Sequence, residues 1–300
     1  MSAADPLRLA EEQAAELQAL EDRVVAAALG TVPAELAALR RAVAGATAVS
    51  PDAWRGVVAR LVAILDALPE RARAAVERGA VDAYRLGLRQ ATGTPLLLTP
   101  PPVDAAGVVA AVLYQQQAVR LTVHSNDDVQ AGLALADRAV TRVRMAAEHH
   151  VHQAAGQAVN DTARELGMVR RWVAERDACL HCLAYQGETA GPDAPFPMGL
   201  TFGKKPLRGV VAGTPLHPHC RCLTQLHDPA DAAVLVSLKR EARRSVAKGW
   251  SLPSESQPER LRAADRLLRA GAGLPQSVET EARRAVKRGQ FRSRSVPSTR

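Results

Sequence analysis

The sequence has few aromatic residues and no long apolar run. Only 3% of the 300 residues are Phe, Trp or Tyr, so a core must be built mainly from Ala, Leu and Val. Such side chains at helical spacing favour an α-rich protein. No stretch has the length of uncharged apolar residues that a membrane-spanning helix needs, so no membrane partner is expected. A basic segment followed by an apolar run and a cleavage site is also missing from the N-terminus, which indicates a cytosolic protein.

The motifs of several enzyme classes are missing as well. The chain contains no H-E-x-x-H, no phosphate-binding glycine loop and no G-x-S-x-G. A zinc deaminase would combine H-x-E with P-C-x-x-C, but there is no H-x-E and Ala178 precedes the first cysteine. We therefore predict no catalytic residues and a protein that is not an enzyme.

Apolar periodicity predicts helices over most of the first 166 residues. The longest runs from the N-cap Ser125 to about Leu166. Ser50 is predicted to cap an earlier helix, and Pro69 is expected to interrupt or kink that helix. The apolar stripe of the long helix consists of Val129, Leu133, Ala136, Val140, Val143, Ala147, Val151, Ala154 and Ala158.

The character of the sequence changes after Gly167. Residues 168–174 contain a Trp and two Val and predict a strand, and residues 223–226 predict a second, closing strand. Between 179 and 228 the chain is rich in Gly, Pro and His and has no helical period. The predicted fold is mainly α: a multi-helix N-terminal region (1–125), a small α+β module with a Cys/His cluster (126–228), and short basic helices (229–300) with a disordered end from Phe291.

All four cysteines lie between residues 179 and 222, in two groups near histidines. The first group is the C-x-x-C pair Cys179 and Cys182. After 34 intervening residues comes the second group, His217-Pro218-His219-Cys220-Arg221-Cys222. In a reducing cytosol such clustering favours a metal over a disulfide. The favoured ligand set is Cys179, Cys182, His217 and Cys222, with Cys220 as the alternative to Cys222.

The metal expected for this set is a structural zinc. Two thiolates from a tight turn and a distant His and Cys complete a tetrahedron, whereas a hydrolytic zinc needs an open position and a general base. His181 and His219 are less favoured as ligands. The competing interpretation is a group of packed thiols, or a disulfide that forms once the protein leaves the cytosol.

A second polar cluster, Glu148-His149-His150-Val151-His152, lies in the long helix. Glu148 and His152 are one turn apart and could share an ion. The favoured interpretation is a polar face packed against a neighbouring element.

Basic residues are concentrated at the C-terminal end. Of the 39 Lys and Arg residues, 16 lie between Lys239 and Arg300, against 6 of the 31 Asp and Glu residues. Such asymmetry favours an acidic partner, usually nucleic acid, bound without sequence preference and in a salt-sensitive way. The alternative is a solvated helical face. The candidate contact residues are Arg243, Arg244, Arg283, Arg284, Lys287 and Arg288.

The stretch from about Arg142 to Cys222 resembles the phage Mu F-type head-morphogenesis domain. The resemblance rests on a helix with Arg and Glu, a Trp-containing strand, an Asp before C-x-x-C, a nearby Gly, and a closing P-x-H-P-x-C-R-C. The matching positions are Arg144, Glu148, Trp172, Asp177, Cys179, Cys182, Gly187 and Pro215 to Cys222.

This resemblance implies a minor capsid protein of a tailed phage that acts in head assembly, portal association and genome packaging or delivery. It would be assembled in the host bacterial cytoplasm and reside in the virion, in the head interior or at the portal vertex. Implied partners are the portal protein, other capsid or scaffold proteins and packaged DNA. Glu148, Trp172, Asp177 and Arg221 are the expected supporting residues, with Arg221 pairing with Asp177 or Glu148. The alternative function is a zinc-dependent nuclease or a nucleic-acid-binding zinc protein.

Overall fold

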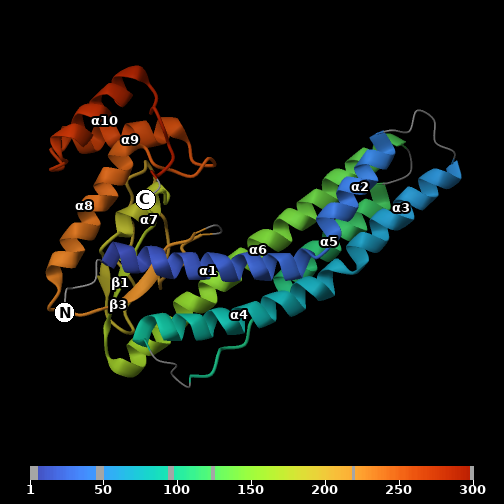
Figure 1. Ribbon diagram of the computed structural model, residues 1–300, viewed down its shortest axis with the longest axis horizontal. Helices are drawn as coiled ribbons and strands as arrows, with labels where there is room; N and C mark the ends of the chain where they lie inside the picture. The colour runs from blue at the N-terminus through green and yellow to red at the C-terminus, as the bar shows by residue number, and fades with distance from the viewer. Residues whose placement is uncertain (1–5, 45–50, 94–97, 123–125, 218–219, 298–300) are drawn as a thin grey trace. The chain divides into compact units, whose positions relative to one another are not determined.

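The computed structural model describes residues 6–44, 51–93, 98–122, 126–217 and 220–297 (Figure 1). The predicted caps Ser50 and Ser125, and His219, lie outside these ranges. The described chain is mainly helical and contains a small three-stranded sheet and a Cys/His cluster, which confirms the predicted fold class. Among the described helices, none combines the length and apolar character needed to span a bilayer.

Helices precede, interrupt and follow the sheet. The elements are α1 (Pro6–Leu29), α2 (Val32–Ala44), α3 (Pro51–Asp66), α4 (Leu68–Thr92), α5 (Ala106–Thr122), α6 (Asn126–Leu166), β1 (Val169–Val173), α7 (Leu180–Tyr185), β2 (Thr189–Ala190), β3 (Leu223–His227), α8 (Ala232–Lys248), α9 (Gln257–Arg269) and α10 (Gln276–Arg288).

The chain forms two compact units, which we describe separately. The helical unit comprises residues 17–85 and 97–154, and the sheet unit comprises residues 1–16, 86–96 and 155–300. Helices α1, α4 and α6 contribute residues to both. The units are discontinuous in sequence, and the sheet unit contains both the Cys/His segment and the basic C-terminal helices.

The helical unit is built on the predicted apolar stripes. Leu61, Leu65 and Leu68 are fully buried, and α3 ends at Asp66 just before Pro69, which confirms the predicted interruption. Helices α1 and α4 approach closely at Gly79, where a Cβ atom would lie 2.4 Å from the Val24 side chain. A larger residue at this position would force the helices apart.

The sheet unit has the strand order β2-β1-β3, with β1 antiparallel to both neighbours. The two predicted strands are confirmed as β1 and β3, and Trp172 of β1 pairs with Thr224 of β3. Gly167, with a φ of 62°, ends α6 and lets the chain turn directly into β1. The two-residue strand β2 was not predicted.

The core of the sheet unit combines the Cys/His segment with the C-terminal helices. Trp172 lies at its aromatic centre, with ring centroids 5.1 Å from Tyr185 and 5.4 Å from Phe196. Residues of α8 and α9 complete this core; they are Ala242, Val246, Ala263 and Leu267. The basic C-terminal segment is therefore part of a folded unit.

The segment after α10 also packs against this unit. Phe291 is buried against Gly249, the left-handed residue that ends α8. Arg294 donates hydrogen bonds to Ser251 Oγ at 2.8 Å and to the carbonyl oxygens of Leu252 and Glu255. The disorder expected from Phe291 onward is thus not found through residue 297. A buried Phe and a multiply bonded Arg order these residues.

Candidate metal centre

The C-x-x-C pair lies at the start of a short helix. Cys179 is the N-cap of α7 with extended backbone angles, and its Sγ accepts a hydrogen bond from the Cys182 backbone N–H at 3.5 Å. Cys182 follows in the first turn and is 1% exposed. The sequence predicted an irregular segment here. A six-residue helix is too short to leave a recognisable apolar period.

The second segment of the site, residues 217–222, leads directly into β3. His217 is half-buried, Cys220 and Cys222 are buried, and Leu223 begins β3 immediately afterwards. The backbone N–H of Cys220 donates to the His217 carbonyl oxygen at 3.0 Å, which holds these two residues close together. Because β3 is paired with β1 over five residues, its position relative to the Trp172 strand is fixed.

The two segments meet. His217 Nε2 lies 3.1 Å from Cys179 Sγ and 3.4 Å from Cys182 Sγ, and Cys182 Sγ lies 3.6 Å from Cys220 Sγ. Two ligand groups are formed in the described chain, Cys179–Cys182–His217 and Cys182–Cys220–Cys222, with ligand atoms within 4.8 Å of one another in each. These groups could hold a metal ion, and Cys182 belongs to both.

Three of the thiols shift one another's pKa in opposite directions. Hydrogen bonding with the Cys182 side chain lowers the pKa of Cys179 to about 2, and the same bond raises the pKa of Cys182 well above its usual range. Hydrogen bonding with Cys182 likewise lowers the pKa of Cys220 well below its usual range. Neighbouring buried thiols thus cannot all ionise together, and a metal ion would remove this restriction by neutralising the thiolates.

His181 has another hydrogen-bond partner. Its Nε2 donates to the Lys205 carbonyl oxygen at 2.8 Å, and it belongs to neither ligand group. The Phe202 backbone N–H donates to the Leu180 carbonyl oxygen at 3.1 Å. The loop after β2 is thereby attached to the C-x-x-C helix at two points.

The predicted supporting residues in the sheet unit surround the site. Trp172 is completely buried in the core that contains three of the cysteines. Arg221, between Cys220 and Cys222, donates to both Asp177 carboxylate oxygens at 3.1 Å and lies 2.8 Å from Glu175. Burial raises the pKa of Glu175 to about 7. The positive charge of Arg221 acts in the opposite direction but is the smaller effect. The structure thus pairs Arg221 with Asp177 and adds Glu175, which the sequence did not indicate.

The other predicted cluster lies in the helical unit. Glu148 is half-buried in α6. His152, one turn later, is buried with its Nε2 3.1 Å from Glu21 of α1. Within the described ranges, the groups of three or more metal-ligating side chains are the two Cys/His groups. The His152–Glu21 contact fits the interpretation of a polar face packed against a neighbouring helix.

The basic residues proposed to contact nucleic acid are exposed on α8 and α10. Arg244 is within 3.4 Å of Glu241, and Arg283 within 2.5 Å of Glu279. Arg244 also lies over the Trp250 ring at 5.5 Å. The solvent-facing positions are Arg243, Arg244, Arg283, Arg284, Lys287 and Arg288.

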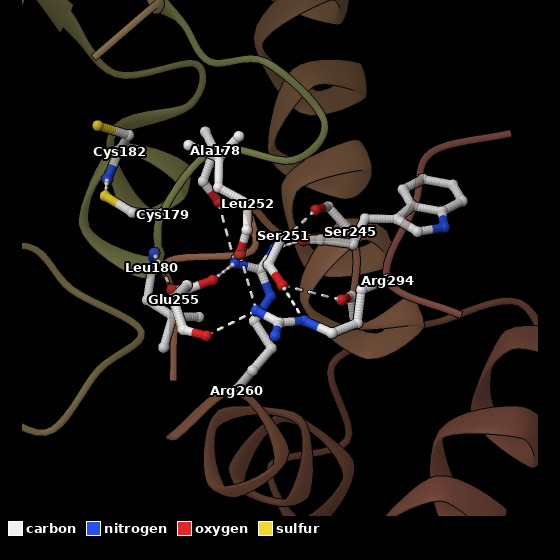
Figure 2. A network of polar contacts seen from close by, with 12 residues as sticks. Ala178, Cys179, Leu180, Cys182, Ser245, Ser251, Leu252, Glu255, Arg260 and Arg294 are labelled. Carbon is white, nitrogen blue, oxygen red and sulfur yellow. Dashed lines mark hydrogen bonds and ion pairs between the residues drawn. The ribbon is translucent and has the colours of Figure 1, made fainter. Parts of the chain in front are cut away.

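Two residues next to the site were missed from the sequence. Arg260 of α9 is 1% exposed, and Glu255 lies in the loop before that helix, 2.5 Å from Arg260. Figure 2 shows both beneath the Cys179–Cys182 turn. The sequence did contain a sign that Arg260 is buried. Arg260 lies on the same face of α9 as the buried apolar residues Ala263, Ala264 and Leu267.

Comparisons with protein-family models, with curated proteins and with solved structures give no match to this chain.

Proposed function

We propose that this chain is a minor capsid protein of a tailed phage, of the Mu F head-morphogenesis type, in which the Cys/His cluster binds a structural zinc ion. The proposal rests on one observation: two segments separated by 34 residues, each bearing part of the motif, meet at hydrogen-bonding distance. The same segments, in the same order, carry the resemblance to the head-morphogenesis domain.

The donor set fits zinc. A tetrahedral zinc with bonds of about 2.3 Å to sulfur separates its sulfur ligands by about 3.8 Å. The 3.6 Å between the sulfur atoms of Cys182 and Cys220 is close to this separation. The distances from His217 Nε2 to the sulfur atoms of Cys179 and Cys182 are 3.1 and 3.4 Å, and a shorter separation is expected there because zinc–nitrogen bonds are shorter than zinc–sulfur bonds. Cys179, Cys182 and His217 would supply three ligands, and Cys222 or Cys220 the fourth. When bound, the zinc would crosslink α7 to the beginning of β3.

The role proposed for this metal is structural. A tetrahedron filled by four protein ligands leaves no position for water or substrate. Cys182, Cys220 and Cys222 are buried in the apolar core, away from solvent. The protein would then act through its surfaces, in the head interior or at the portal vertex, by binding the portal protein and other capsid or scaffold proteins.

Two experiments test these steps. Metal analysis of protein purified without added zinc should give one zinc per chain, and replacement by cobalt should give thiolate charge-transfer bands. Cys220→Ser and Cys222→Ser, compared by cobalt spectrum, identify the fourth ligand.

For the phage role, the purified protein should bind portal rings in a pull-down. A chain that binds neither metal nor portal would refute both steps.

The exposed basic residues on α8 and α10 favour one further candidate, a nucleic-acid-binding zinc protein. If the chain is a head protein that contacts packaged DNA, binding of the full chain to DNA should be independent of sequence and should weaken steeply with salt. The double variant Arg284→Ala, Lys287→Ala should lower the salt dependence, whereas Arg269→Ala, on α9, should not. Sequence preference would support a regulator, and metal-dependent cleavage of the DNA would support a nuclease; either result would argue against the head-protein proposal.

A further inference from the structure

Arg260 is an arginine of α9 whose side chain is buried in the interior of the sheet unit. It is 1% exposed, at a position of α9 flanked by the buried residues Ala263 and Ala264. Burying a guanidinium is costly unless its donors are satisfied and its charge is paired. Its surroundings must therefore supply several hydrogen bonds.

The partners of Arg260 come from four different places in the sheet unit. It forms an ion pair with Glu255 at 2.5 Å and donates to the Ala178 carbonyl oxygen at 2.9 Å. It also donates to Ser245 Oγ in α8 at 3.1 Å and to the Trp250 carbonyl oxygen. Figure 2 shows these contacts converging on the guanidinium next to the Cys179–Cys182 turn.

Glu255 reaches the same turn from the other side. One of its carboxylate oxygens accepts a hydrogen bond from the Leu180 backbone N–H at 3.0 Å, and the other pairs with Arg260. Its own backbone carbonyl is bonded by Arg294 at 2.6 Å. The carboxylate is thus held from two directions.

These two contacts bracket Cys179. The Ala178 carbonyl belongs to the peptide group before Cys179, and the Leu180 N–H to the peptide group after it. Because peptide groups are planar, a residue has only the two soft dihedrals between its flanking planes. Holding both planes fixes these angles, found here at φ −65° and ψ 162°, and thereby the direction of the Cys179 side chain.

We infer that Glu255 and Arg260 form a positioning pair for the metal site, which orients Cys179 toward His217 and Cys182. The inference rests on the proposed metal binding. It makes the affinity for metal depend on two residues, Glu255 and Arg260, that lie 33 and 38 positions after Cys222. Residues that orient metal ligands affect affinity without touching the ion.

The test is cobalt affinity in the full chain, measured by competition with a chromophoric chelator. Glu255→Ala and Arg260→Gln should each weaken cobalt binding by about tenfold or more. Glu255→Gln should lose less, because its amide oxygen still accepts from Leu180. The matched control Arg269→Gln, which breaks an exposed ion pair with Asp265 on the same helix, should keep the wild-type affinity.

A second measurement separates positioning from general stability. Urea unfolding of the metal-free variants shows how much each change destabilises the fold itself. If the fold weakens while the cobalt affinity of the folded protein stays unchanged, the network only attaches α9 to the core and the inference is wrong. Should Glu255→Ala not fold without metal, Glu255→Gln decides by the same comparison. Wild-type protein that binds no cobalt would refute the proposed metal site and this inference together, whereas tight wild-type binding with equally tight variants would refute the inference alone.

Discussion

Cys182→Ser should remove the stabilisation that metal provides. Cys182 belongs to both ligand groups, so its loss leaves neither group with three members. The metal would join Cys182 to His217 across 34 intervening residues. By analogy with a disulfide, closing a loop of this size removes unfolded-chain entropy equivalent to about 4 kcal/mol.

Urea unfolding with zinc and with a chelator measures this difference. The wild-type free energy of unfolding should fall by about 4 kcal/mol on chelation, and the variant should be equally weak under both conditions. Arg269→Gln is the control, because it removes an exposed ion pair with Asp265 and Arg269 belongs to neither ligand group. A wild-type difference below about 1 kcal/mol, or an equal difference in Cys182→Ser, would refute a metal that joins Cys182 to His217. Loss of the zinc effect in Arg269→Gln would show that the difference does not report on the proposed ligands.

Trp172→Ala should lower the free energy of unfolding in urea by about 3 to 5 kcal/mol, because removing this completely buried indole leaves a cavity in the core. A decrease in the free energy of unfolding below about 1 kcal/mol would contradict that packing. Arg221→Ala should cost about 1 to 3 kcal/mol with zinc saturating, because Glu175 and Asp177 lose their counter-ion; unchanged stability would exclude a structural role for this pair. Burial lowers the pKa of His227 from its ordinary value of 6.5. The unfolded chain therefore takes up the proton more readily, and stability present above about pH 6.5 is lost as the pH falls toward the lower folded pKa. His227→Gln should show a smaller loss between pH 7 and 5, and an identical pH profile would contradict this account.

Features set by long apolar patterns could be predicted from the sequence. The long helix α6 follows from the local period of its apolar residues, and strand β1 follows from its Trp and Val content; both elements were found. The pairing of the C-x-x-C segment with the later His and Cys residues also followed, because thiols and imidazoles at such spacings share one chemistry.

The remaining features depend on contacts between distant segments. Helix α7 and strand β2 have six and two residues, too few for a period, and tertiary hydrogen bonds hold them in place. The packing of α8 and α9 on the cysteines was missed because their basic residues suggested a separate segment. Their apolar faces, which include Val246 and Leu267, were the sign that they cover a core.

The sheet unit is built from segments that lie far apart in the sequence, and this affects when its contacts can form during synthesis. Gln13, in the first helix, receives a hydrogen bond from Gln225, 212 residues later, at 2.7 Å. At synthesis rates of about 5 to 20 residues per second, Gln13 waits about 10 to 40 s for this partner to be translated. Glu255 and Arg260 emerge later still. Gln13 can contact Gln90 much earlier, but its bond with Gln225 and the contacts of the peptide groups flanking Cys179 with Glu255 and Arg260 form only after these later residues have been translated.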